Sequence, residues 1–231
     1  MRSAERGNWS PRYGDAGDRW GVQPGDVWVA GPATLACVDV ESEDGARFWR
    51  RYSGAMLIYS DPPWSTGNAR CFRTKAGLGH DDVTFDRLWR RLASIFAETL
   101  SPRGRLFVEI GEQCREEAKR ILAEHSLPVR QQWPITYYRR HPCWLLLSGA
   151  DVDAPSPEGL DDEMTPTWAI KNTTLRGDLV CDPCFGRGLT AVAAVRAGRS
   201  FVGSELHPRR LAVALDRLVA LGFSATRERR L

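Results

Sequence analysis

A strand, a glycine-containing loop, a helix and a second strand follow one another between residues 177 and 205, and this order constrains the fold most. The first apolar run ends at Asp182, and the loop after it contains Gly186 and Gly188. A helix rich in small residues then leads into the strand that ends at Glu205. Because two successive strands joined by a helix need a crossover connection, this order predicts an α/β fold with a parallel sheet.

The loop and the terminal acid together favour a nucleotide-like ligand. Glycines let the backbone approach a ligand at a helix N-terminus. Glu205 lies 23 residues after Asp182, which is about the spacing at which a carboxylate binds ribose hydroxyls in nucleotide-binding folds. The loop has neither the Gly-Lys-Ser/Thr of a phosphate loop nor the third glycine of the dinucleotide fingerprint. The sequence therefore predicts an adenosine-containing cofactor other than ATP or NAD.

A second candidate site lies at residues 60–64, Ser-Asp-Pro-Pro-Trp. The apolar run at 55–59 is expected to be a buried parallel strand, and the two prolines end it because they have no backbone N–H. This leaves the Asp61 carboxylate, a proline carbonyl and the Trp64 indole at the carboxyl end of a strand, where open α/β sheets bind ligands. Hydrogen-bond acceptors beside a flat aromatic ring suit a planar group that carries an NH2, such as a nucleobase. The alternative interpretation is a strand-end turn with the tryptophan in the core.

Apolar spacing predicts most of the other elements. The stripe between residues 85 and 100 has helical spacing and is expected to face the core. The runs at 129–138 and 143–148 fit an antiparallel hairpin at a sheet edge. Further strands are expected at 27–29, 35–40 and 105–110, and further helices at 42–52, 112–126 and after 207.

Three short segments are basic. Residues 65–77 contain Arg70, Arg73 and Lys75 without an acid, and we expect them to form a loop that either holds a phosphate backbone or is simply solvated. Arg139 and Arg140 lie at the hairpin turn and are a further nucleic-acid candidate. The tail to residue 231 reads as a weak basic patch. The net charge of +3 is too small to indicate a polyanion partner by itself.

The chain of 231 residues predicts one domain, residues 26–231, after a polar N-terminal arm at 1–25. Within it we expect a catalytic half at 26–149, an acidic connection at 150–164 and a cofactor half at 165–222. No apolar run approaches the roughly 20 residues that span a bilayer, and the polar N-terminus is unlike a signal peptide. Six cysteines without framework spacing predict a reducing, cytoplasmic setting.

Of three other patterns, two are better explained without a chemical role. Cys181 and Cys184 have zinc-ligand spacing but no second ligand pair, so no metal site is predicted. His207 is expected to begin a helix rather than to act as a base. Glu109 and Glu112 flank a strand end, where they either line the pocket or are ordinary loop acids.

Asp61-Pro62-Pro63-Trp64, followed downstream by Asp182-Pro183-Cys184-Phe185-Gly186-Arg187-Gly188, resembles the S-adenosylmethionine-dependent amino methyltransferases of DNA. The catalytic motif comes before the cofactor motif, as in the β-type arrangement of that N6-adenine/N4-cytosine family. The resemblance spans residues 27–222. It implies a class I methyltransferase, Rossmann-like, doubly wound sheet of seven strands, mostly parallel with an antiparallel hairpin at one edge.

The resemblance also implies roles for individual residues. Asp61 and the Pro62 carbonyl would accept hydrogen bonds from the target amine within the motif that Pro63 completes, and Trp64 would stack on the base. Asp in the first position is typical of the adenine N6 enzymes, so the implied function is methylation of N6 of adenine in DNA. The implied cofactor is S-adenosyl-L-methionine, bound by Asp182, Pro183, Cys184, Phe185, Gly186, Gly188, Thr190 and Glu205.

Other functions stay open at this stage. An RNA N6-adenine or a DNA N4-cytosine methyltransferase would use the same motifs. A non-catalytic methyltransferase-fold subunit would be expected to have lost one of the two motifs, and a plain nucleotide-binding domain gives Asp61 no role. Only the acidic stretch at 149–164 stands where such enzymes carry a recognition region. The chain would therefore read little sequence, act on single strands or RNA, or depend on a homodimer or partner subunit.

Overall fold

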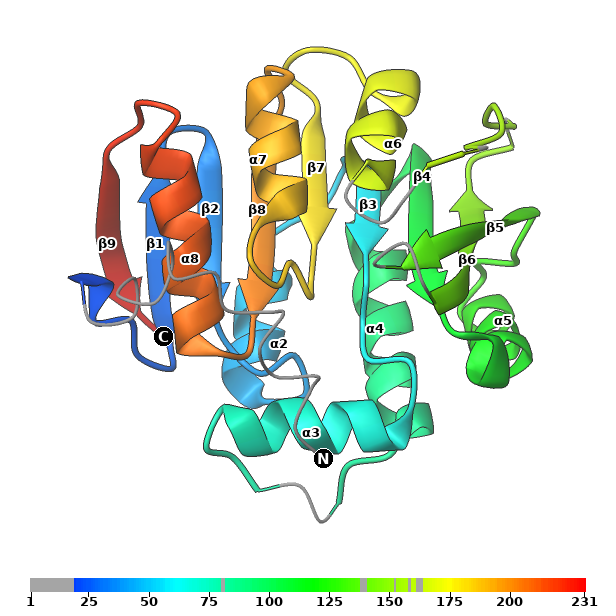
Figure 1. Ribbon diagram of the computed structural model, residues 1–231, viewed down its shortest axis with the longest axis horizontal. Coiled ribbons are helices and arrows are strands. Elements are labelled where there is room, and N and C mark those ends of the chain that lie inside the picture. The colour runs from blue at the N-terminus through cyan, green and yellow to red at the C-terminus, as the bar shows by residue number, and fades with distance from the viewer. Residues whose placement is uncertain (1–18, 80–81, 138–140, 152, 158, 161–163) are drawn as a thin grey trace.

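The computed structural model describes residues 19–79, 82–137, 141–151, 153–157, 159–160 and 164–231. In this part of the chain the strands form one sheet of nine, in the order β5-β6-β4-β3-β7-β8-β2-β1-β9, between two layers of helices (Figure 1). The strands are β1 (Asp26–Ala30), β2 (Ala33–Cys37), β3 (Ala55–Ser60), β4 (Leu100–Ile110), β5 (Gln131–Tyr137), β6 (His141–Gly149), β7 (Leu179–Asp182), β8 (Ser200–Glu205) and β9 (Ala225–Arg230).

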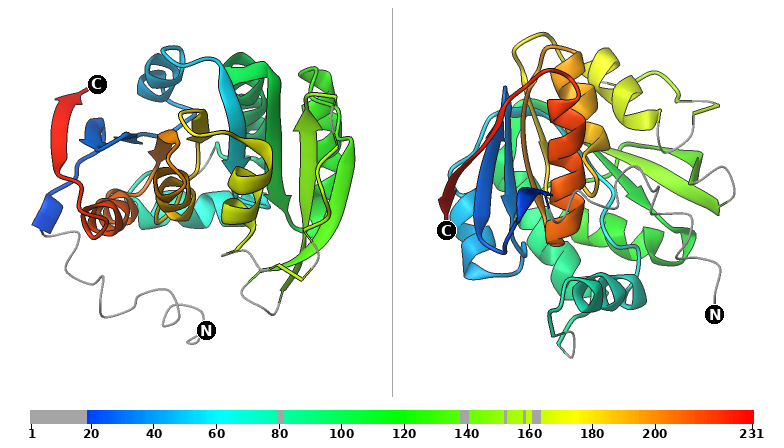
Figure 2. Two further views of the ribbon diagram at one scale, coloured as in Figure 1. Left: turned by 90° about the horizontal axis from the view of Figure 1, so that it is seen from above. Right: turned by 60° about the vertical axis from the view of Figure 1, so that its left-hand side comes forward.

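The helices bury opposite faces of this sheet. One core cluster takes its helical residues from α6 (Thr165–Thr173), α7 (Leu189–Arg196) and α8 (Pro208–Val219). The other cluster takes them from α2 (Glu43–Trp49), α4 (Phe85–Thr99) and α5 (Arg115–Glu124), with one residue from α3 (Thr66–Lys75). The short 3-10 turn η2 (Glu112–Cys114) precedes α5. Figure 2 shows the two layers from above. The predicted doubly wound α/β architecture is therefore confirmed.

The strand directions agree with the predicted class. The central strands β4, β3, β7, β8 and β2 are mutually parallel. β6 runs antiparallel to both β4 and β5, so the predicted hairpin forms one edge of the sheet. No helix in the described ranges is long and apolar enough to cross a membrane.

The sheet is wider than the expected seven strands, because β1 and β9 extend the edge beyond β2. Residues 225–230, which belong to the tail predicted as a weak basic patch, form strand β9, an element that was not expected. The reason lies in Asp26 of β1, which is fully buried. Its carboxylate accepts a 3.1 Å hydrogen bond from Arg230 and lies 3.8 Å from Arg227, so the arginines of β9 neutralise a charge that burial would otherwise penalise strongly.

The expected loop at 65–77 is also wrong, because residues Thr66–Lys75 form helix α3. The Ser65 hydroxyl caps it by accepting a hydrogen bond of 3.1 Å from the amide of Asn68. Only Ala69 of this helix is buried, so the helix has no apolar stripe from which periodicity could have predicted it. Figure 1 shows α3 running across the carboxyl ends of the central strands.

β4 begins earlier than expected. The strand was expected at 105–110, yet it starts at Leu100 with an irregular register against β3. Gly104 makes this approach feasible, since a Cβ there would lie 2.4 Å from the carbonyl oxygen of Ala55.

Candidate active site

The two sequence motifs meet at the point where the chain changes direction across the sheet. β3 leads through α3 and α4 to β4 on one side, and β7 leads through α7 to β8 on the other. The carboxyl ends of β3 and β7 therefore flank a topological switch point, where open α/β sheets bind ligands. A hydrogen bond of 3.2 Å from the hydroxyl of Ser60 to Oδ1 of Asp182 joins the two strand ends.

Asp182 is the most constrained carboxylate of this site. It is 2% exposed, and the Thr190 hydroxyl donates to its Oδ2 at 2.8 Å while the Cys184 amide donates to its Oδ1 at 3.0 Å. Burial raises the pKa of Asp182 to about 7, although these donors act in the opposite direction. The carboxyl group is thus poised to ionise when a cation approaches.

The conformation of the glycine loop after Asp182 is fixed by contacts with α8 and β8. Gly188 has φ +81°, and a Cβ there would lie 2.6 Å from the Cβ of Ala214 on α8. The carbonyl of Pro183 accepts a hydrogen bond of 2.7 Å from Ser204. Phe185 is buried and packs edge-on against Phe201 at 6.1 Å. Phe185 therefore anchors the loop to the core, and its contact with a cofactor stays a prediction.

Glu205 ends β8 beside this loop. It is 6% exposed, and its Oε1 accepts a hydrogen bond of 2.8 Å from the amide of His207. Burial raises its pKa, while Arg210 is the strongest opposing influence. Burial also raises the pKa of the Cys184 thiol well above its usual range, so this cysteine is protonated. His207 caps α8 by accepting from the amide of Arg209, as expected of a helix-entry residue.

The Asp61–Trp64 motif holds its own carboxylate in place. The Trp64 indole donates to Oδ1 of Asp61 at 2.9 Å. The Trp89 indole, from α4, donates to the carbonyl of Pro63 at 3.1 Å. Within the described residues no donor binds the carbonyl of Pro62. The motif therefore distinguishes its two proline carbonyls, one fixed structurally and one available to a ligand.

Trp64 is itself held by residues that the sequence did not single out. Its ring packs edge-on against Tyr137 with centroids 5.0 Å apart. It also lies over Gly111, where a Cβ would approach Cε3 of the indole to 3.0 Å. The glycine directly after the apolar run of β4 was the available sequence signal for this contact. Trp64 is partly exposed rather than tucked fully into the core.

A buried acid completes the site. The Tyr59 hydroxyl donates to Oε1 of Glu109, and both residues are buried. Burial raises the pKa of Tyr59 well above its usual range, and Glu109, Asp61 and Asp182 add to this electrostatically. Glu109 is therefore a buried strand residue and not a loop acid. Asp61, Asp182 and Glu205 also act together on the Cys184 thiol, whose pKa each of them raises.

The predicted nucleic-acid residues differ in what they already bind. Arg73 contacts the Asp39 carboxylate and donates to the Gly79 carbonyl at 2.8 Å. Arg70 donates to the carbonyl of Val83 at 3.2 Å, and Lys75 is exposed at the end of α3. Arg139 and Arg140 lie outside the described residues. A contact of any of these side chains with nucleic acid stays a prediction.

Comparison with known proteins supports the resemblance drawn from the motifs. The N6_N4_Mtase family model, described as DNA methylase, matches residues 163–216, the segment that contains the glycine loop and Glu205. No curated protein matches the sequence.

The fold is that of solved DNA methyltransferases. M1.HpyAVI superposes with a TM-score of 0.59 at 19% identity, covering 81% of this chain and 99% of that one. TTHA0409 from Thermus thermophilus, a putative DNA modification methylase solved with S-adenosyl-L-methionine, gives 0.55 at 18% identity, covering 80% and 93% of the two chains. The cytosine-N4-specific PvuII DNA methyltransferase gives 0.60 at 11% identity, covering 80% and 86%. The predicted class I methyltransferase fold is thereby confirmed.

Proposed function

We propose that this chain is an S-adenosylmethionine-dependent methyltransferase that modifies the exocyclic amine of a nucleobase, with N6 of adenine in DNA as the preferred target. The observation that carries the proposal is the hydrogen bond between Ser60 and Asp182. It brings the end of the predicted catalytic strand against the predicted cofactor loop. A domain that only bound a nucleotide would have no use for the ordered Asp61–Trp64 motif on the other side of this contact.

The residues around the switch point fit the proposed cofactor. S-adenosylmethionine supplies a methyl group on a positively charged sulfonium and also carries an ammonium group. Asp182 and Glu205 are buried carboxyl groups whose pKa values burial raises, so an adjacent cation would favour their ionised forms. M1.HpyAVI has been solved as a complex with the same cofactor. We assign binding of the cofactor ribose to Glu205. The glycine loop is assigned the role of letting the backbone approach the cofactor closely.

Asp61 and the Pro62 carbonyl are assigned to the target amine. An ionised carboxylate can accept several hydrogen bonds, so Asp61 can bind an amine N–H while it accepts from the Trp64 indole. Two acceptors on the amine draw its lone pair out of conjugation with the ring and aim it at the methyl group. As charge develops on the amine nitrogen, the fixed carboxylate stabilises it. The N–C bond would form as the S–C bond of the sulfonium breaks, which leaves a neutral thioether. The methylated amine would then release its proton to water, so the first step needs no general base.

Adenine is preferred over cytosine because Asp61 stands in the first position of the motif. The fold itself does not decide the base, since PvuII DNA methyltransferase is cytosine-N4-specific. Duplex DNA would require the target base to be flipped out, which costs a few kcal/mol. Single-stranded DNA and RNA avoid that cost and are the competing substrates.

The test is transfer of labelled methyl from S-adenosylmethionine to duplex DNA, single-stranded DNA and RNA in parallel, followed by identification of the modified nucleoside. Asp61→Ala should lower the rate by about 10²-fold or more while cofactor binding persists. Asp86→Ala, which removes an exposed carboxylate on α4, is the control and should keep full activity. N4-methylcytosine as the product would overturn the adenine assignment. Failure to bind the cofactor would overturn the methyltransferase assignment itself.

A further inference from the structure

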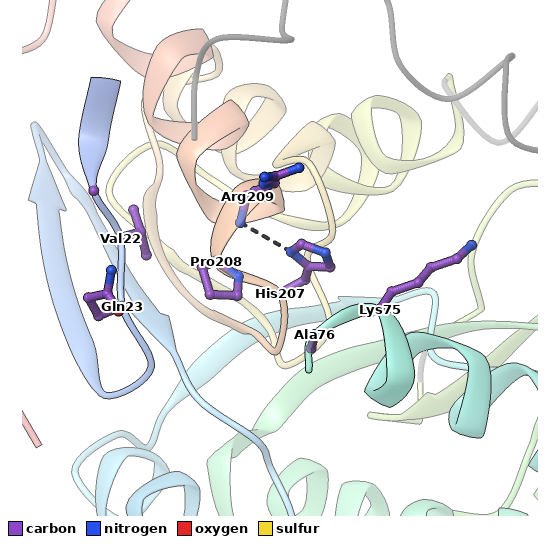
Figure 3. Close-up of a pocket in the computed structure, with 8 residues that line it drawn as sticks. Val22, Gln23, Lys75, Ala76, His207, Pro208 and Arg209 are labelled. Carbon is purple, nitrogen blue, oxygen red and sulfur yellow. Dashed lines mark hydrogen bonds between the residues drawn. The ribbon is translucent and has the colours of Figure 1, made fainter. Parts of the chain in front are cut away.

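A cavity of about 300 Å³ lies beside the cofactor half of the site, between the end of α3, the start of α8 and residues 21–23 (Figure 3). Lys75 and Arg209 line it together with Gln23, Ala76 and His207. Among the described residues no acid lines this cavity. The charged side chains that line the cavity, Lys75 and Arg209, are thus both positive, which suits an anionic ligand.

Lys75 and Arg209 differ from the cations around them because, among the described residues, neither side chain contacts an acid, an aromatic ring or a hydrogen-bond acceptor. Arg73, two residues earlier on α3, contacts Asp39. Arg210, next to Arg209, lies over the Phe72 ring at 4.4 Å. Within the described ranges, neither the Lys75 ammonium nor the Arg209 guanidinium makes a hydrogen bond or an ion pair, and both residues are exposed. These two charges are available to a ligand.

The helix terminus itself offers little to an anion here. The amide of Arg209 donates to Nδ1 of His207 at 3.1 Å, and the amides of Arg210 and Leu211 donate to the carbonyl of His207. Pro208 has no amide hydrogen. The first turn of α8 is thus satisfied internally, so an anion in this cavity would be bound by the side chains of Lys75 and Arg209.

We propose that this cavity binds a backbone phosphate of the polynucleotide whose base is methylated, with Lys75 and Arg209 as its cationic ligands. The inference rests on the proposed function. It adds Arg209 to the substrate surface and assigns Arg73 to holding α3 in place. Cations that neutralise backbone phosphates supply most of the sequence-independent affinity of such proteins.

The position of α3 indicates which phosphate this is. The helix starts two residues after Trp64 and ends at Lys75, and its ten residues span about 15 Å. A stacked strand rises about 3.4 Å per nucleotide. The bound phosphate is therefore roughly four nucleotides from the target base, and short substrates would not reach it.

The experiment compares the wild-type chain with the double variant Lys75→Gln/Arg209→Gln. Affinity for an oligonucleotide of about 20 nucleotides is measured by fluorescence anisotropy over a range of salt concentrations. The slope of log K against log[salt] should become shallower by about 0.7 for single strands or about 0.9 for duplexes, because the variant no longer neutralises this one phosphate. The matched control is Lys171→Gln/Arg196→Gln, two exposed helical cations without an ionic partner in the described ranges, at the amino edge of the sheet. This control should keep the wild-type slope.

Two further readouts separate a phosphate contact from a structural effect. S-adenosylmethionine affinity should be the same in the double variant and the wild type, and so should the KM for a trinucleotide with the target base in the middle. An unchanged salt slope with methyl transfer intact would overturn this inference and leave the proposed function standing. If the double variant also raised the KM for the trinucleotide by the same factor, the inference would be overturned. It would also be overturned if the double variant lost binding only to a free nucleoside monophosphate. A shallower slope without methyl transfer to any base would support the phosphate site and sink the proposed function.

Discussion

Burial of Asp182 should make the free protein less stable as the pH rises. Its pKa is raised from 3.8 to about 7, so between these values the folded state holds a proton that the unfolded state has released. Stability therefore falls with increasing pH across this window. This destabilisation is absent at pH values below the pKa of Asp182 in the unfolded state. It is complete once the pH exceeds the pKa of Asp182 in the folded state.

The size of this effect follows from the two pKa values. One pKa unit corresponds to about 1.4 kcal/mol, so the full penalty approaches about 4 kcal/mol, of which about 3 kcal/mol develops between pH 5 and pH 8. Asp182→Asn removes the ionisation and keeps the size of the side chain. The Thr190 hydroxyl, which donates to Oδ2 in the wild type, can turn to accept from the new amide. The variant should therefore gain stability relative to the wild type by about 2 to 3 kcal/mol over this pH range.

The assay is urea unfolding of the cofactor-free protein at several pH values between 5 and 8. Parallel pH dependences for wild type and Asp182→Asn would refute the reasoning. Asp86→Asn is the control: Arg90 lowers the pKa of Asp86 from 3.8, so this carboxyl is ionised in both the folded and the unfolded state between pH 5 and pH 8. Its removal should leave the pH dependence of stability in this window unchanged. The same linkage predicts that wild-type affinity for S-adenosylmethionine rises with pH through this window, and that the variant loses this dependence.

Two smaller predictions concern the surroundings of the catalytic motif. Gly111→Ala places a Cβ 3.0 Å from the Trp64 ring, and the resulting shift of the indole should lower kcat/KM for methyl transfer by about ten- to a hundredfold. Arg73→Gln leaves the Asp39 carboxylate without its guanidinium partner in a partly buried position. It should lower the free energy of unfolding by about 1 to 3 kcal/mol, measured in urea.

Each of these has a matched control in the chain. Gly79→Ala adds a Cβ into open space and should leave methyl transfer unchanged. Arg90→Gln breaks two exposed ion pairs, with Asp86 and with Glu124, each of which is worth about 0.2 to 1 kcal/mol at most. Gly111→Ala with full activity would mean that the position of Trp64 does not matter. An Arg73→Gln variant as stable as Arg90→Gln would mean that the contact with Asp39 is not a stabilising one.

The elements that sequence predicted best are those whose residues face the core on a regular period. β3 and β7 are short apolar runs ended by prolines or a glycine loop, and α4 has a complete apolar stripe, so each signal lies in consecutive residues. α3 was missed because it crosses the sheet edge with only Ala69 buried. β9 was missed because it is charged along most of its length, and its place depends on Asp26, which is distant in sequence.

The same distinction applies within the site. The sequence predicted that Asp61 and Asp182 would both lie at the carboxyl edge, because parallel strands end together there. It could not predict the partners that fix the site, such as Trp89 on the Pro63 carbonyl or Glu109 on the Tyr59 hydroxyl. These contacts join residues 26 and 50 positions apart. They depend on how the helices and strands are placed against one another. No pattern of neighbouring residues in a single sequence reports that placement.

Trp64 shows why the catalytic motif has to be considered as one unit. A tryptophan that only stacked on a base could have its ring nitrogen in solvent, but here that nitrogen holds Asp61. The ring is positioned in turn by Tyr137 from the edge hairpin and by Gly111 at the end of β4. The orientation of the carboxylate is therefore coupled to the packing of three strands through one indole. Any movement of the hairpin when a substrate binds would reach Asp61 through Trp64, without passing through the cofactor loop.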